Sequence, residues 1–211
     1  MTSRSARRES GAPDAPQQRR RGAALEDAIR AAAFAELSEA GYHAFSVESV
    51  AARAQTGKGS IYRRWPTKQE LVMDALLAEL PEPNDFGISS AMDDAITTAD
   101  ALRLVARGIA GVIASQAGDA IRAIKFEAMV DPELAELVDQ RFQAPRRDAL
   151  TSLLRRGIER GEVRPGADTE LVADVLPAVL IHRMITQREK VTAQDIETII
   201  EQIVIPLVEV R

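Results

Sequence analysis

The sequence predicts an all-α fold, and three observations support this prediction. Apolar residues recur at intervals of three and four along most of the chain, which is the spacing of one helix face. No segment shows the alternation of apolar and polar residues that is typical of a strand. Helix starts are explicit, as at Asp131-Pro132, where an N-cap residue precedes a first-turn proline. We therefore expect helices joined by turns, without a sheet.

The chain begins with a segment that cannot build a core. Residues 1–20 are rich in Arg, Ser, Pro and Gln and contain almost nothing apolar, which predicts a disordered basic tail. A helix is expected from about Gly22 to Ala40, with Gly41 as its C-terminal stop. Its apolar face consists of Leu25, Ile29, Ala33, Phe34 and Leu37.

Residues 46–65 predict two short helices joined by a tight turn. Ser46 can accept a hydrogen bond from a free N–H at the start of the first helix. The apolar face of this helix consists of Val47, Val50, Ala51 and Ala54. The turn consists of Gln55, Thr56 and Gly57. In the second helix Ile61 and Trp65, four residues apart, can point inward, and Pro66 is expected to end the helix.

The outward side chains of the second short helix suit a DNA duplex. They are Lys58, Gly59, Ser60, Tyr62, Arg63 and Arg64. Cations suit phosphates, small residues allow close approach, and hydroxyls can bond to bases. No acidic residue occurs from Gln55 through Gln69, whereas a merely solvated face would ordinarily mix in Glu and Asp. The pattern therefore indicates a helix-turn-helix aimed at DNA rather than a solvated cationic hairpin.

At this point the segment resembles the DNA-binding domain of TetR-type (tetracycline-repressor-like) transcriptional regulators, over roughly residues 20–80. In that family a long helix precedes the motif, and a Lys-Gly-Thr-Leu-Tyr-like run precedes an aromatic residue, Pro, Ser/Thr and Lys. The matching residues are Lys58, Gly59, Ser60, Ile61, Tyr62, Trp65, Pro66, Thr67 and Lys68. Gln55 stands where the family usually has a turn glycine, and Thr56 where it usually has an apolar residue. A left-handed Gln55 would cost roughly 1 kcal/mol.

The predicted DNA-binding residues are Ser46, Gln55, Thr56, Lys58, Gly59, Ser60, Tyr62, Arg63 and Lys68. We expect Arg63 and Lys68 to contact phosphates, with Lys68 helped by the positive end of its helix. Base reading is expected from Thr56, Lys58 and Ser60, while Gly59 permits approach and Tyr62 contacts the backbone or a thymine methyl. The arginines Arg19, Arg20 and Arg21 either follow phosphates or the minor groove, or are simply solvated.

A connecting helix follows directly. Thr67 and Glu70 have the spacing of a capping box, and the helix is expected to run to residue 80. The prolines of Pro81-Glu82-Pro83-Asn84 forbid its continuation, so we place a domain boundary there. The DNA-binding domain is thus residues 21–80, and a helical domain for effector binding and dimerisation is residues 84–211. Its helices are expected at about 92–116, 119–130, 132–160, 168–190 and 192–210.

Composition narrows the class of protein. The chain has 211 residues and no cysteine, which excludes disulfides and thiolate metal sites. Residues 1–80 hold 12 Lys and Arg against 10 Asp and Glu, a formal charge of +2, whereas the remainder carries −7. Such an acidic remainder would help to orient the basic end toward a duplex. The sequence lacks a secretory apolar run and a membrane-length apolar stretch, so we expect a cytoplasmic protein with no membrane partner, cofactor or metal.

The last two helices are candidates for a dimer interface. The final helix carries an apolar stripe, and the helix before it is apolar nearly all round, so it must be covered on both sides. A second copy would provide one cover in a two-fold four-helix interface, an arrangement that the family resemblance also implies. The alternative is that both helices are interior. The predicted interface residues are Leu171, Val175, Val179, Ile196, Ile199, Ile200, Ile203 and Leu207.

The resemblance also implies a small-molecule pocket in the C-terminal domain, whose occupation moves the connecting helix. The candidate pocket residues are Phe126, Met129, Phe142, His182 and Met184. They combine adaptable apolar bulk with a rare polar group, although such residues at helical spacing are more often core. Pro177 predicts a kink that opens space for a ligand or adjusts packing. The effector is expected to be small and apolar or amphipathic.

The sequence therefore predicts a homodimeric regulator, a repressor released from a palindromic double-stranded operator by a small molecule. An enzyme in the helical domain is the first alternative. It has little support, because the two histidines are not at metal-binding spacing and no phosphate-binding glycine loop occurs. No catalytic residue is assigned. The second alternative is a regulator without a ligand that acts through protein partners.

Overall fold

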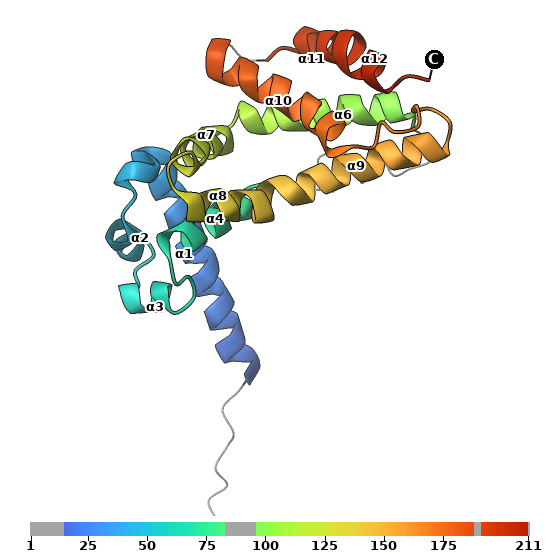
Figure 1. The fold of residues 1–211 in the computed structure, drawn as a ribbon. Coiled ribbons are helices and arrows are strands. Elements are labelled where there is room, and N and C mark those ends of the chain that lie inside the picture. Colours follow the sequence, from blue (N-terminus) through green and yellow to red (C-terminus); the bar gives the residue numbers. More distant parts are fainter. Residues whose placement is uncertain (1–14, 83–95, 188–190, 211) are drawn as a thin grey trace, which may run out of the picture.

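The computed structural model describes residues 15–82, 96–187 and 191–210, apart from the side chains of residues 15–21 and 184–187. All regular elements in these ranges are helical, which confirms the all-α prediction (Figure 1). The helices are α1 (Ala15–Ala44), α2 (Val47–Arg53), α3 (Lys58–Tyr62), α4 (Lys68–Ala78), α6 (Thr98–Ile113), α7 (Gln116–Ala128), α8 (Pro132–Val138), α9 (Ala144–Glu159), α10 (Glu170–Gln187), α11 (Ala193–Ile199) and α12 (Ile205–Val208). Two π-helical turns, η2 (Asp139–Gln143) and η3 (Ile200–Val204), lie between successive helices.

The first helix is longer than expected. It begins at Ala15, so residues 15–20 of the expected disordered tail are helical, while residues 1–14 lie outside the described residues. Gln and Arg, which dominate residues 17–21, are good helix formers and explain the extension. The predicted stop at Gly41 takes the form of a kink, because Gly41 has φ 74° and ψ 172° and a final turn continues to Ala44.

The turn between α2 and α3 contains a left-handed residue, Gln55. The Ser46 hydroxyl caps α2 by accepting from Ser49 N at 3.3 Å. At the other end, Thr56 N donates to Ala51 O at 2.9 Å and Gln55 N to Ala52 O at 3.2 Å. This is the Schellman arrangement, which requires a left-handed residue after the cap, and Gln55 has φ 50°. Gln55 is therefore in the left-handed conformation that costs roughly 1 kcal/mol.

Replacing Gln55 with glycine should stabilise the protein by about 0.5 kcal/mol. Relief of the left-handed strain, about 1 kcal/mol, is partly offset by the greater freedom of glycine in the unfolded chain. Urea denaturation of the full chain measures the change. Gln55→Ala is the matched control, because alanine keeps the strain. A glycine variant less stable than the alanine variant would contradict the strain argument.

Helix α3 ends earlier than expected. It stops at Tyr62, whereas the sequence suggested that it continues until Pro66. Trp65 precedes a proline, and the residue before a proline is pushed away from the helical region, so the chain leaves the helix before Pro66. Thr67 and Glu70 then form the predicted capping box of α4, with Glu70 N donating to Thr67 Oγ1 at 3.1 Å.

Several boundaries in the second half also differ. Thr97 caps α6, and the break before α7 comes at Ala114 and Ser115 because the Ser115 hydroxyl accepts from Ala117 N at 3.2 Å. The predicted 132–160 and 192–210 helices are each interrupted by a π-helical turn, η2 and η3. Pro145 and Pro206 follow these turns and cannot supply the N–H that a regular α-helix needs there, which accounts for both interruptions.

Packing does not follow the predicted boundary at residues 81–84. One apolar core joins the helix-turn-helix to α7 and α8, through residues such as Ile124, Leu134 and Val138. A second core contains α6, α9, α10 and the last helices. Helices α7 and α8 therefore belong to the C-terminal segment by sequence and to the DNA-binding half by packing.

Candidate nucleic-acid interface and effector cavity

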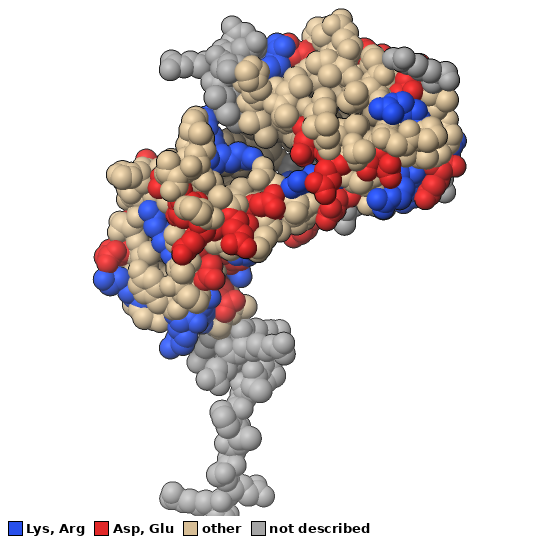
Figure 2. Space-filling model, viewed as in Figure 1, with Lys and Arg blue, Asp and Glu red and all other residues tan. Residues whose placement is uncertain are grey.

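Helix α3 lies at one end of the molecule and α11 and α12 lie at the other (Figure 1). The two side chains predicted to point inward do so: Ile61 of α3 is fully buried, and Trp65, in the turn after α3, is 7% exposed. Tyr62 is 47% exposed, and Arg63, Lys58 and Gly59 are exposed as well. In the view of Figure 2, Lys and Arg side chains lie at the tip where Figure 1 places α3, and Asp and Glu gather across the middle.

The remaining predicted residues lie close to this tip. Gln55 is exposed, and Ser46, Thr56 and Ser60 are half-buried. The Lys58 ammonium pairs with Glu48 Oε1 at 2.5 Å, and this contact raises the Lys58 pKa. Lys58 therefore carries an exchangeable acidic partner that a base or phosphate would have to replace.

Arg64 and Lys68 are turned toward the protein. Arg64 Nε donates to Glu26 Oε1 at 3.1 Å and its Nη1 to Ser60 O at 3.0 Å, so this side chain ties α3 to α1. The Lys68 ammonium donates to Tyr42 O at 2.7 Å and lies 4.2 Å from the Tyr42 ring centroid. Burial lowers the Lys68 pKa. Lys68 therefore differs from Arg63, with which the sequence analysis grouped it as a phosphate contact. It is turned inward because the start of α4 packs against the end of α1.

Asp74 is a site that the sequence interpretation missed. Its Oδ2 accepts from Arg30 Nε at 2.8 Å and Trp65 Nε1 at 2.9 Å, and its Oδ1 accepts from Arg141 Nη2 at 3.0 Å. Burial opposes ionisation, yet the hydrogen bonds from these donors outweigh it and lower the Asp74 pKa. One carboxylate therefore joins α1, the turn that follows α3, α4 and η2. The available signal was a lone acid among the apolar residues 71–77.

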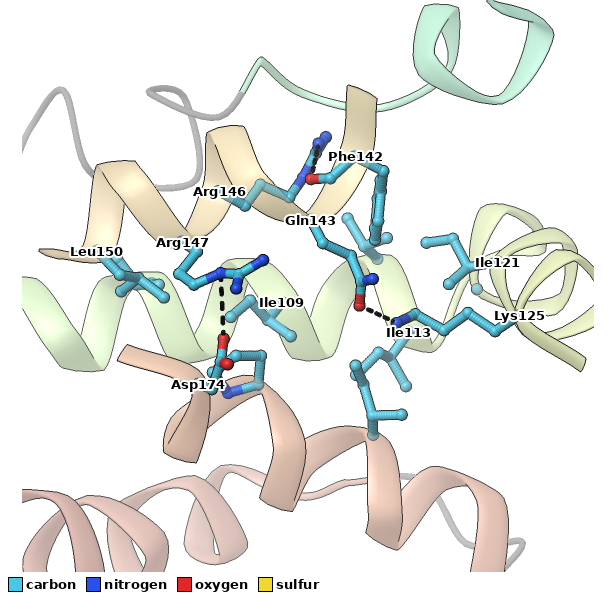
Figure 3. A pocket seen from close by; sticks show the side chains of 15 residues that line it. Ile109, Ile113, Ile121, Lys125, Phe142, Gln143, Arg146, Arg147, Leu150 and Asp174 are labelled. Atoms are coloured by element: carbon cyan, nitrogen blue, oxygen red, sulfur yellow. Dashed lines mark hydrogen bonds and ion pairs between the residues drawn. The ribbon is translucent and has the colours of Figure 1, made fainter. Parts of the chain in front are cut away.

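A cavity of about 120 Å³ lies between the two apolar cores (Figure 3). Ile121 comes from the first core, whereas Val105 and Leu150 come from the second. Phe142 and Gln143 of η2 also line it, next to Arg141, which holds Asp74. Its lining is mostly apolar with a few polar heads, as is typical of small-molecule sites.

Most of the predicted pocket residues are elsewhere. Phe142 and Pro177 line the cavity, but Phe126 and Met129 are 54% and 78% exposed and His182 is exposed outside the lining. Those three assignments to the pocket were wrong for this cavity, because helical spacing cannot tell which face a neighbouring helix covers. The side chain of Met184 lies outside the described residues.

The predicted dimer residues divide into two groups. Ile196, Ile199 and Ile200 are buried in the protomer's own second core, so their assignment to an interface was wrong. Leu171 and Ile203 are 77% and 41% exposed. Val175, Val179 and Leu207 are half-buried. Leu171 and Ile203, with the half-buried Val175, Val179 and Leu207, are called the outer strip; they belong to α10, η3 and α12.

Comparison with known proteins decides the family. The model of the bacterial regulatory proteins of the tetR family matches residues 29–75, and the model of the tetracyclin repressor-like C-terminal domain matches residues 92–203. The chain belongs to the TetR family. This TetR-family chain is 34% identical over 166 residues to the DNA-binding transcriptional repressor TetR of Mycobacteroides abscessus, covering 78% of this chain and 84% of that protein.

Other relatives agree with this membership. The regulator YdeS of Bacillus subtilis is 32% identical over 168 residues, covering 78% of this chain and 80% of YdeS. A TetR-family regulator from Mesorhizobium loti has the same fold, with a TM-score of 0.72 at 21% identity over 90% of this chain and 99% of that one. The protein is thus a helix-turn-helix transcriptional regulator, and its relatives are regulators rather than enzymes. No helix among the described residues is long and apolar enough to cross a membrane.

Proposed function

We propose that this TetR-family chain is a homodimeric, cytoplasmic repressor that leaves a palindromic operator when a small apolar or amphipathic molecule enters the cavity. The observation that carries the proposal is the position of η2. Its Phe142 and Gln143 line the cavity, and the adjacent Arg141 binds Asp74. Asp74 in turn binds Trp65, in the turn that follows α3. The name of the Mycobacteroides abscessus relative supports repression.

The coupling has a specific mechanical form. A ligand that alters η2 changes the geometry between Arg141 and Asp74, and with it the orientation of α4 and α3. A second contact, from Gln69 Nε2 to Asp131 Oδ2 at 3.1 Å, links α4 to the N-cap of α8. Release requires only that the ligand binds the DNA-incompetent arrangement more tightly than the competent one.

A dimer would present two copies of α3 to the DNA duplex. One α3 is a short reading element, whereas two related by a two-fold axis, about 34–36 Å apart, would enter successive major grooves of a palindrome. The outer strip of Leu171 and Ile203 supports this assembly, because these exposed apolar side chains have no cover within the described protomer.

Selection of bound duplexes from a random pool tests the proposal. Recovery of a palindrome whose half-sites are about one helical turn apart supports a dimeric operator reader. Asymmetric or random sequences would oppose it. Screening metabolites for loss of operator binding then tests release, and failure of all of them would favour a ligand-independent regulator.

Arg63 should contribute more to phosphate binding than Lys68. Arg63→Ala is expected to weaken operator and unrelated duplexes by similar factors and to reduce the salt slope of binding by about 1 for each protomer. Lys68→Met is the matched control and should leave the slope unchanged, because its ammonium is bound to Tyr42 O. Fluorescence anisotropy at several salt concentrations gives both slopes. A reduced slope in Lys68→Met alone would restore the assignment made from the sequence.

A further inference from the structure

The polar groups of the cavity identify the chemistry of its ligand. We propose that the cavity takes an amphipathic carboxylate, whose head binds the Lys125 ammonium and whose apolar chain lies against Ile109, Ile113 and Ile121. This rests on the proposed function, in that the cavity is taken to be the effector site. It adds the charge and the orientation of the ligand, which an apolar lining alone does not specify.

Lys125 has an unusual environment for a cation. Its Nζ donates to Gln143 Oε1 at 2.7 Å and lies 6.0 Å from the Phe142 ring centroid. Among the residues that the structure describes, no carboxylate lies within ion-pair distance of this ammonium. Burial lowers the Lys125 pKa, with Asp174 acting weakly in the opposite direction. The charged head is therefore held at the cavity by a neutral amide.

Asp174, the acidic residue of the cavity lining, is already paired with an arginine. Asp174 Oδ1 lies 3.8 Å from Arg147 Nε, and the same guanidinium binds Asp139 and Glu170. Arg146 donates to Phe142 O at 3.0 Å and to Pro81 O at 3.3 Å, at the rim of the cavity. Three carboxylates therefore balance the Arg147 guanidinium, and the cavity lining adds Lys125 and Arg146 without a further acidic residue, which favours an anion over a cation.

The geometry gives the ligand one orientation. In Figure 3, Lys125 reaches from α7 toward Gln143, and Ile109, Ile113 and Ile121 lie around the same space. A carboxylate that replaces Gln143 Oε1 as acceptor forms an ion pair with the Lys125 ammonium, in which both donor and acceptor are charged, whereas the amide offers only a dipole. Because Gln143 belongs to η2, this replacement occurs on the turn that also carries Arg141.

Calorimetric titration of the full chain with octanoate, octanamide and octylamine tests the proposal. The three molecules share a chain and differ in head charge. Octanoate should bind about 10- to 100-fold more tightly than octanamide, because its charged carboxylate pairs with the Lys125 ammonium whereas the amide is a neutral acceptor. Octylamine should bind most weakly. Lys125→Met should remove the preference for octanoate while keeping the apolar wall.

A second variant keeps the proposal testable if Lys125→Met does not fold. Gln143→Glu places a carboxylate beside Lys125 with almost no change of shape, and it should weaken octanoate by at least about 10-fold through like-charge repulsion. Octanamide binding as tightly as octanoate, an unchanged preference in Lys125→Met, or no binding of any of the three overturns the proposal. Lys125-dependent octanoate binding that leaves operator affinity unchanged supports the site and rejects release as its role, so the two proposals fail separately.

Discussion

Replacing Asp74 with alanine is expected to lower the free energy of unfolding by about 2 to 3 kcal/mol and to abolish selective operator binding. The change leaves the Arg30 and Arg141 guanidinium groups and the Trp65 indole N–H without their shared acceptor. Breaking a fully buried pair would cost more, but these arginine side chains are 30% and 35% exposed, so solvent recovers part of the loss.

Operator binding should fall further than stability alone explains. Trp65 lies in the turn that follows α3 and is anchored by Asp74, so the alanine variant loses the fixed position of α3 as well as the ion pairs. Urea denaturation and operator anisotropy, each at a temperature where the variant is folded, measure the two effects. Wild-type operator affinity in a folded Asp74→Ala protein would contradict this role.

Two control variants separate the contributions. Asp119→Ala removes an exposed carboxylate that pairs with Arg122 on one helix, and stability should change by less than about 0.5 kcal/mol. Arg141→Gln removes one of the three donors to Asp74 and keeps the bonds from Arg30 and Trp65, so it should bind cavity ligands normally while releasing the operator less.

The folded pKa of Asp74 is depressed, so its contribution to stability is present above an unfolded pKa of about 3.9 and is lost as pH falls through the lower folded value.

The second large effect is expected from Ile203→Glu, which should convert the proposed dimer to monomers and weaken operator binding by about 100-fold or more. Ile203 is 41% exposed in η3, on the outer strip with Leu171. A two-fold axis brings two copies of the new carboxylate to one interface, where burial and like charge both oppose association.

Sedimentation velocity measures the assembly and anisotropy measures the operator affinity. Met129→Glu is the matched control, because Met129 is 78% exposed and lies outside this strip. It should leave both quantities unchanged. A dimer that persists in Ile203→Glu and dissociates in Met129→Glu would move the interface to the turn between α7 and α8.

Local rules account for what could be predicted from the sequence. The predicted caps at Ser46, Thr67 and Asp131 are all present. Each depends only on a side chain and the N–H groups two or three residues later, so no distant contact is needed to predict it. The division of α3 into a buried side with Ile61 and an exposed side with Tyr62 follows from helical spacing in the same way.

The less accurate predictions concern which neighbour covers a given face. The stripe that includes Ile199 and Ile203 is one helical face by sequence, yet Ile199 lies in the protomer's core and Ile203 is exposed. The lining of the cavity could not be predicted for the same reason. Lys125 and Gln143 are 18 residues apart in the sequence, and only packing brings them together.

The helical class, the capped helix starts and the helix-turn-helix could be predicted from the residues alone, because each is set by interactions within a few residues. Packing between distant helices turns Lys68 inward, lets Asp74 join α1, α4 and η2, and places the cavity between the two cores. These outcomes depend on helices distant in sequence and on the burial of charged groups between them. A periodic pattern states that a face is buried but contains no information about its partner.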